Sequence, residues 1–264
     1  MNIRVYYFTG TGNSLKIARD LSGALGVSEL FSMTKLAKQE GEIRIDGDVV
    51  CFVFPVYFAR PPVFIDEFIE RSSFTGTQYI SAVINGGGLF GRALPLFDAM
   101  LHKKGQKLDS GFIIPMPGNH PKFARLIRRA HEEYYKGEEE KIRFISDIIG
   151  QQQPHNVETN WGLMGRILSS YGFRKAYSLS LAKKLDSSFW VNDSCTKCGT
   201  CVRICPTGNI SLEYENPRWH GDCINCAACY HHCPENAICL GKEDPDFRYT
   251  HPGVSAQNII DGNG

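Results

Sequence analysis

Short hydrophobic runs alternate with longer amphipathic ones over residues 1 to about 150. Runs rich in β-branched and aromatic residues predict five strands, at residues 3–8, 27–31 (a weak one), 48–54, 78–85 and 107–114. Between the strands, apolar residues at helical spacing predict helices, at residues 14–25, 62–70, 89–103 and 121–149, the last broken near Gly137. Strands that alternate with helices indicate a doubly wound α/β fold with a parallel sheet.

This pattern also predicts how the chain is divided and where it binds a ligand. Right-handed crossovers place the ligand at the carboxyl ends of the strands, where the strand order reverses. Residues 151–186 are polar, then rich in serine and basic residues, and we expect a partly helical connector. Residues 187–264 contain most of the cysteines. The sequence therefore predicts three parts, residues 1–150, 151–186 and 187–264.

Eight cysteines form two runs with the spacing C-x2-C-x2-C-x3-C, and each run is followed by proline. The first run is Cys195, Cys198, Cys201 and Cys205, and the second, 28 residues later, is Cys223, Cys226, Cys229 and Cys233. Three close cysteines can bind three corners of a 4Fe-4S cubane, and in two-cluster arrangements the cysteine before proline ligates the other cluster. We therefore expect one cluster on Cys195, Cys198, Cys201 and Cys233, and the second on Cys223, Cys226, Cys229 and Cys205.

Two structural zinc sites are the alternative, although zinc usually takes two separated C-x2-C pairs. Cys51 and Cys239 lie outside both runs, and we expect them to be buried small hydrophobic residues. His231 and His232 lie between Cys229 and Cys233. We expect these histidines to face solvent or to donate hydrogen bonds, and not to bind metal.

Composition and charge restrict the partners. The formal net charge of the 264-residue chain is +1, so no overall field attracts nucleic acid or an anionic membrane. No apolar run reaches the roughly 18 residues of a membrane helix, and residues 1–8 resemble a strand and not a signal peptide. We expect a cytoplasmic protein without a membrane span, in which cysteines hold metal and do not form disulfides.

The loop Thr9-Gly10-Thr11-Gly12-Asn13-Ser14 leaves the first predicted strand and opens the first predicted helix. Hydroxyl groups, an amide and free backbone N–H groups at a helix N-terminus predict a phosphate site. The loop is neither a P-loop nor a dinucleotide fingerprint, because the Gly-Lys-Ser/Thr ending and the third glycine are absent. A capping turn without a ligand is the alternative.

Two further loops are expected at the same edge of the sheet. Residues 55–62 follow the strand at 48–54 and include Tyr57 and Phe58, and residues 85–90 include three consecutive glycines. Aromatic side chains can stack on a flat ring, and glycines let backbone amides approach its edge. Together the three loops predict a site for a phosphate attached to a planar ring.

Residues 1–150 resemble the flavodoxin family, which implies a five-stranded sheet of order 2-1-3-4-5 and bound FMN. The resemblance implies that Thr9, Thr11, Gly12, Asn13 and Ser14 hold the FMN phosphate, and that the flavin is bordered by Pro55, Val56, Tyr57, Phe58, Asn85, Gly86, Gly87 and Gly88. The ring loops depart from the family because they lack the tryptophan that many flavodoxins stack on the flavin.

The cysteine-rich part resembles bacterial-type ferredoxins, small α+β domains with two 4Fe-4S clusters. The whole chain resembles flavodoxin-ferredoxin fusion proteins, including two segments to which the sequence assigns no chemistry, residues 116–119 and 247–252. The resemblance implies transfer of electrons between FMN and the two clusters, and redox proteins as partners.

Two other functions remain open at this stage. The first is an FMN-dependent reductase of a quinone, a nitro compound or NAD(P)H, although no second nucleotide-binding unit is found. The second is a redox sensor or a binding module in which the clusters are structural. A long distance between flavin and cluster would require domain motion or a second subunit, as in a homodimer.

Overall fold

The computed structural model of the chain describes residues 1–27, 29–121, 134–159, 185–214, 216–242 and 247–263. Its first part is a five-stranded parallel sheet of order β2-β1-β4-β6-β7. The strands are β1 (Ile3–Tyr7), β2 (Leu30–Ser32), β4 (Val49–Pro55), β6 (Tyr79–Gly86) and β7 (Ser110–Pro115). This is the 2-1-3-4-5 order of flavodoxin-like sheets, and it confirms the predicted fold class.

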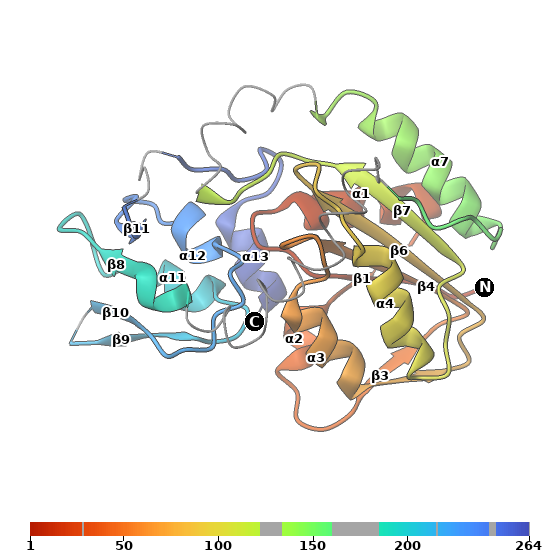
Figure 1. Cartoon of the computed structure of the whole chain (residues 1–264), viewed down its shortest axis with the longest axis horizontal. Coiled ribbons are helices and arrows are strands. Elements are labelled where there is room, and N and C mark those ends of the chain that lie inside the picture. Colours follow the sequence, from red (N-terminus) through yellow and green to blue (C-terminus); the bar gives the residue numbers. More distant parts are fainter. Residues whose placement is uncertain (28, 122–133, 160–184, 215, 243–246, 264) are drawn as a thin grey trace.

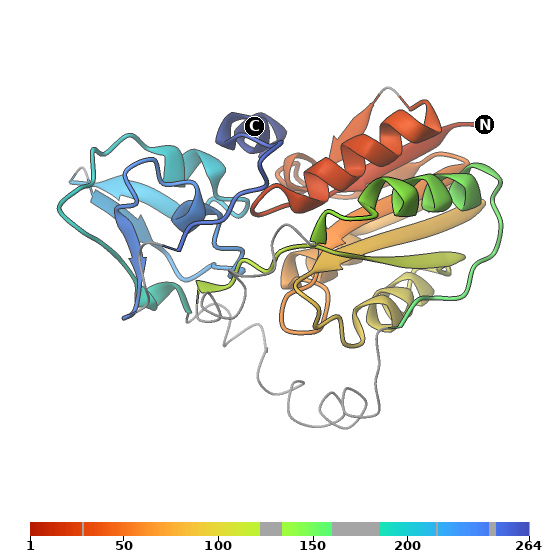
Figure 2. The same ribbon diagram turned by 90° about the horizontal axis from the view of Figure 1, so that it is seen from above.

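Helices cover both faces of this sheet (Figure 2). Helices α1 (Asn13–Leu25) and α7 (Glu138–Gly150) lie on one face, and α3 (Val63–Arg71) and α4 (Ala93–His102) lie on the other. All seven residues of β4 are buried, as a central strand covered on both faces requires. α7 begins after Gly137, where the sequence predicted a break, and residues 122–133 of that predicted helix lie outside the described residues.

Short elements of this part escaped the sequence prediction. β3 (Ile43–Asp46) pairs in parallel with β5 (Ser72–Thr75) in a small second sheet, and α2 (Met33–Ala37) follows β2 directly. Each contains only four or five residues, too few for hydrophobic periodicity to identify. Tertiary packing stabilises them instead, since Ile43 and Ile45 are buried in the core.

The second part, which we call the cysteine module, comprises the described residues 185–242. It contains η2 (Leu185–Ser188), β8 (Phe189–Val191), α11 (Thr200–Ile204), β9 (Ile210–Glu213), β10 (Asn216–Trp219), α12 (Ala228–His231) and β11 (Ile238–Leu240). β8 pairs with β11 and β9 with β10, both antiparallel. The first cysteine run lies between β8 and β9, and the second lies between β10 and β11. Each two-stranded sheet therefore takes one strand from each half of the module, which confirms a small α+β region built on a repeat.

The chain then returns toward the sheet through residues 247–263, which we call the C-terminal segment. It ends in α13 (Ala256–Asn263), a helix that the sequence did not predict and that contacts both α11 and α2. Figure 1 shows α13 at the junction of the two parts. The three-part division stays a prediction, and residues 160–184 of the predicted connector lie outside the described residues. None of the described helices has the length and apolar character that a membrane crossing requires.

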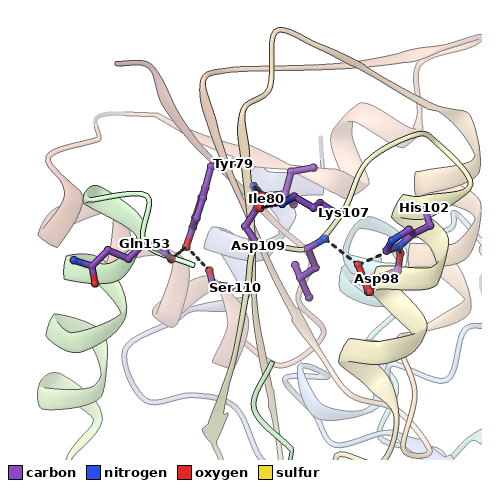
Figure 3. Close-up of polar contacts among 9 residues, drawn as sticks. Tyr79, Ile80, Asp98, His102, Lys107, Asp109, Ser110 and Gln153 are labelled. Atoms are coloured by element: carbon purple, nitrogen blue, oxygen red, sulfur yellow. Dashed lines mark hydrogen bonds and ion pairs between the residues drawn. The ribbon is translucent and has the colours of Figure 1, made fainter. Parts of the chain in front are cut away.

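Polar side chains bind the sheet together at its amino end, opposite the predicted ligand site. The Tyr79 hydroxyl donates to the Gln153 carbonyl at 2.7 Å and lies 2.7 Å from the Ser110 hydroxyl, which is completely buried (Figure 3). The carboxylate of Asp109 accepts a hydrogen bond from the backbone N–H of Ile80 at 2.9 Å. These contacts join β6, β7 and the chain that follows α7.

We expect Tyr79→Phe to lower the free energy of unfolding by about 1–3 kcal/mol, because the buried Ser110 hydroxyl and the part-buried Gln153 contact both lose the hydroxyl. Tyr6→Phe is the matched control, since its hydroxyl makes a long, 3.5 Å contact with the Asp46 carbonyl and a contact with the Arg4 side chain. Urea unfolding followed by circular dichroism measures both. An equal loss in the two variants would contradict the assigned role of Tyr79.

Candidate functional site

A cavity of about 610 Å³, which we call the main cavity, lies at the carboxyl ends of the strands. The loops after β1, β4, β6 and β7 form its walls. Eleven of the thirteen residues predicted to contact FMN line it, namely Thr9, Thr11, Asn13, Ser14, Pro55, Val56, Tyr57, Phe58, Asn85, Gly86 and Gly87. The structure therefore brings the three predicted loops together at the edge of the sheet where a doubly wound fold binds its ligand.

Gly12 and Gly88 were predicted to contact FMN but do not line the main cavity. Gly12 has a φ of +101°, and a Cβ at this position would lie 2.9 Å from Cβ of Val254 and 3.1 Å from Cβ of His251. Glycine is required here by the backbone conformation and by close packing against the C-terminal segment. The sequence pattern showed the glycine but not the segment that packs against it.

The Thr9–Ser14 loop presents the N-terminus of α1 to the main cavity. None of the described side chains caps this helix, and its first turn contains no acidic residue, so these residues do not compensate the positive end of the helix dipole. The Thr9 hydroxyl accepts a 3.1 Å hydrogen bond from the N–H of Gly12, and the Ser14 hydroxyl accepts one of 2.7 Å from the Asn85 side chain. Each hydroxyl proton can therefore donate to an anion in the cavity.

The side chain of Asn13 holds the loop in place from two directions. Its Nδ2 donates to the Pro117 carbonyl at 3.2 Å, and its Oδ1 accepts from the Tyr249 hydroxyl at 2.6 Å. Burial raises the pKa of Tyr249 well above its ordinary value, so its hydroxyl stays protonated and can donate. Because both polar ends of the Asn13 side chain are engaged, its contact with a phosphate would come from the backbone N–H.

The loop after β7 forms a wall that the sequence prediction missed. Residues 117–120 line the main cavity, and Nδ2 of Asn119 donates to the Thr11 hydroxyl at 3.0 Å. This loop includes most of the segment 116–119 to which the sequence assigned no chemistry. The sequence did contain one indication that this loop lines the cavity. The loop follows the last predicted strand, so it lies at the same edge of the sheet as the other loops.

The cysteine module supplies the remaining wall through Asn225 and Ala227. Both residues lie in the loop that connects Cys223, Cys226 and Cys229. A Cβ on Gly10 would lie 2.8 Å from the Cys226 carbonyl oxygen, so the two loops touch through their backbones. A cluster on the second cysteine run would therefore adjoin the main cavity.

His231 and His232 form the hydrogen-bonded joint between the two parts. His231 Nδ1 accepts from the N–H of Tyr249 at 3.2 Å, so Nε2 bears the proton and donates to the Asn119 carbonyl at 2.6 Å. The His232 ring is hydrogen-bonded to the backbone of Gly10. Burial lowers the pKa of His231 to about 3 and that of His232 to about 4, so both are neutral at pH 7. The sequence left two environments open for these histidines, exposure to solvent or hydrogen bonding. Both side chains are buried and hydrogen-bonded.

Two small cavities separate the eight cysteines into the predicted sets of four. One cavity is lined by Cys195, Cys198, Cys201 and Cys233. The other is lined by Cys205, Cys223, Cys226 and Cys229. Each set combines three cysteines of one run with the last cysteine of the other, and such a set fits the four corners of a cubane. The crossed ligation is the arrangement that these contacts favour.

Comparison with known proteins supports the assignment of the cysteine module. Residues 194–238 match the family model of the 4Fe-4S dicluster domain. The chain thus joins a flavodoxin-like fold to a 4Fe-4S dicluster domain, as the resemblance predicted. No curated protein matches the chain.

Two solved structures that resemble this chain do so at low similarity. A short-chain flavodoxin associated with a bacterial microcompartment shares 14% identity at a TM-score of 0.39, over 58% of this chain and 99% of its own. Rubredoxin oxygen:oxidoreductase from Desulfovibrio gigas shares 11% identity at a TM-score of 0.33, over 57% of this chain and 35% of its own. TM-scores this low support no argument, so the fold assignment depends on the observed strand order.

The backbone repeats itself around the two cysteine runs of the dicluster domain. Left-handed φ angles between 51° and 71° occur at equivalent positions of both runs, in the pairs Lys197 and Asn225, Gly199 and Ala227, and Gly208 and Asn236. These turns direct amides toward sulfur, since the N–H of Asn225 lies 3.3 Å from the Cys223 sulfur and the N–H of Ala237 lies 3.2 Å from the Cys233 sulfur. Such hydrogen bonds tune the reduction potential of a cluster.

The thiol groups differ in their environment, even within one set of four. Burial raises the pKa of Cys201 to about 11 and that of Cys223 to about 12, whereas hydrogen bonds with Thr200 lower the pKa of the exposed Cys198. A buried thiol ionises at neutral pH only when a metal supplies positive charge, so cluster assembly would release protons. Cys51 and Cys239 are buried outside both cavities, which confirms their expected role as small hydrophobic residues.

We expect Cys205→Ser to damage the cluster of the second run and to spare that of the first, because Cys205 lines the cavity of the second run. Iron analysis and electron paramagnetic resonance of the reduced protein measure the effect. Cys239→Ala is the control and should retain all iron. Loss confined to the cluster of the first run would contradict the crossed ligation.

Proposed function

We propose that this protein is an iron-sulfur flavoprotein that transfers electrons between FMN in the main cavity and two 4Fe-4S clusters in the cysteine cavities. The observation that supports this most directly is the shared wall, because Asn225 and Ala227 belong to a cluster loop and also line the main cavity. FMN exchanges one or two electrons and each cluster exchanges one, so together they would link two-electron and one-electron redox partners.

The main cavity fits FMN in size and in the distribution of its polar groups. Its volume of about 610 Å³ is in the usual range for cofactor sites. The helix N-terminus and the hydroxyls of Thr9, Thr11 and Ser14 would hold the phosphate. Tyr57 and Phe58 also line the cavity and offer aromatic surface on which the ring would stack. Among the described residues, no lysine or arginine lines the cavity, so the dipoles and hydrogen bonds of these residues would offset the phosphate charge.

The two cysteine sets occupy different positions along the proposed route. Cys226 and Cys229 are buried, and the carbonyl of Cys226 meets Gly10 at the main cavity. Cys198 is exposed, and its loop lies at the surface of the protein. The second run would therefore hold the cluster that exchanges electrons with FMN, and the first run the cluster that exchanges them with a redox protein. In this arrangement all three centres would lie within one chain.

Protein purified under anaerobic conditions should contain about eight irons, about eight sulfides and about one FMN per chain. Colorimetric iron and sulfide assays and the absorption of released flavin measure these contents. Zinc in place of iron, or about four irons, would refute the two-cluster assignment. A full set of clusters without flavin would refute the proposed FMN site alone.

We expect Gly10→Ala to slow electron exchange between the flavin and the clusters, because the added methyl group would clash with the Cys226 carbonyl and separate the loops. Gly86→Ala is the matched control in the same cavity, since its Cβ would meet no atom closer than 3.6 Å. Anaerobic photoreduction followed by stopped-flow absorption measures the exchange. Equal rates in the two variants would contradict direct exchange at this contact.

Turnover with NAD(P)H distinguishes the relay from an FMN-dependent reductase. The relay should show no brisk oxidation of NAD(P)H with a small acceptor in the absence of a partner protein. Brisk turnover under these conditions would favour the reductase. Clusters that cannot be reduced reversibly in exchange with the flavin would favour a structural role for them.

A further inference from the structure

The C-terminal segment connects the cysteine module to the loop that would hold the FMN phosphate. It leaves the module after β11, passes the carboxyl edge of the sheet and ends in α13 at the junction (Figures 1 and 2). The sequence assigned no chemistry to its first residues. Its contacts with the Thr9–Ser14 loop indicate a function for it.

Three contacts hold the loop through residues that do not themselves line the main cavity. The N–H of His251 donates to the Thr11 carbonyl at 2.9 Å, and the Tyr249 hydroxyl donates to Oδ1 of Asn13 at 2.6 Å. The back of Gly12 packs against Val254 so closely that a Cβ would lie 2.9 Å away. Three successive residues of the loop are thus held by residues 249–254 of the C-terminal segment, which we call the stretch.

The same stretch is held on its other side by the cysteine module. The N–H of Tyr249 donates to Nδ1 of His231 at 3.2 Å, and the Arg248 guanidinium donates to the carbonyl of Ile238 at 2.9 Å. At the far end, Nδ2 of Asn263 donates at 2.9 Å to the carbonyl of Ile204, which lies directly before Cys205. The position of the segment therefore depends on the folded cysteine module.

Neighbouring residues fix the geometry of the stretch itself. The Tyr135 hydroxyl lies 2.9 Å from that of Tyr249, and because Tyr249 donates to Asn13, Tyr135 donates to Tyr249. His251 Nδ1 accepts from the N–H of Gly253 at 3.0 Å, and its carbonyl accepts from the N–H of Val254 at 3.0 Å. Residues 251–254 thus form a tight turn that presents Val254 to Gly12.

We propose that Tyr249 and the turn at residues 251–254 are positioning residues for the FMN phosphate. Tyr249 donates to Oδ1 of Asn13, so this oxygen is engaged and does not accept hydrogen bonds from the amides at the start of α1. The turn fixes the backbone of Thr11 and Gly12, whose orientation decides where those amides point. This inference rests on the proposed FMN site and deepens it, because it places phosphate recognition under the control of the cysteine module.

A consequence of this arrangement is reciprocal coupling. If the C-terminal segment strengthens FMN binding, bound FMN must stabilise the docked segment by the same free energy. FMN should therefore slow amide hydrogen exchange at residues 249–254, which would not touch the cofactor themselves.

The test compares Tyr249→Phe with wild type, both with loaded clusters under anaerobic conditions. Calorimetric titration should show about tenfold weaker binding of FMN to the variant, because the buried hydrogen bond to Asn13 is lost together with that from Tyr135. Binding of riboflavin, which has no phosphate, should change little, and the iron content should stay at the wild-type level. Tyr214→Phe is the control, since Tyr214 is 97% exposed, and should bind both flavins as wild type does.

The outcomes separate this inference from the proposed function. Unchanged FMN affinity in Tyr249→Phe, or equal weakening for FMN and riboflavin, would overturn the positioning role and leave the FMN site standing. If wild type with loaded clusters binds no FMN, the proposed function fails. Hydrogen exchange in the flavin-free protein then decides the positioning role, since faster exchange of the amides of residues 11–15 in Tyr249→Phe supports it and unchanged exchange overturns it.

Discussion

Gly10 and the carbonyl of Cys226 approach so closely that no side chain fits between them, and the rest of the arrangement depends on this contact. It brings the loop of the second cysteine run to the carboxyl edge of the sheet. Asn225 and Ala227 then complete the main cavity, which without them would be bordered only by the loops of the sheet. Glycine is therefore required at position 10 by the contact between the two parts, and not only by the conformation of the loop.

The joint is made largely of directional polar contacts. His231 accepts at one ring nitrogen and donates at the other, an arrangement that only the neutral ring can adopt. Asn13 likewise uses both ends of its side chain, toward Pro117 and Tyr249. Apolar surfaces tolerate sliding, whereas hydrogen bonds of fixed direction hold one register. Electron exchange between two centres falls steeply with distance, so a fixed register suits the proposed relay.

The two cysteine runs are nearly equivalent in sequence and backbone but not in surroundings. At equivalent positions the first run has Gly199 and the second has Ala227, which holds the same left-handed conformation with a φ of 55°. A left-handed alanine is strained relative to glycine, and strain of this kind tends to be retained at functional sites. Ala227 lies in the wall of the main cavity, and Gly199 lies near the surface beside the exposed Cys198. Packing against the sheet thus makes one run internal and leaves the other accessible.

The sequence by itself determined the class of sheet, its five strands and the two cysteine runs, because periodicity, turn residues and ligand spacing are local properties of the chain. It also located eleven residues of the main cavity, since loops that follow parallel strands must meet at one edge. Only the tertiary structure decided that Asn119, His231, Tyr249 and His251 join the two parts. These contacts link residues more than 100 positions apart in most cases, as between Asn13 and Tyr249, and no local pattern encodes such a pairing. For the same physical reason, the sequence could not predict the packing of Gly12 or the role of the C-terminal segment.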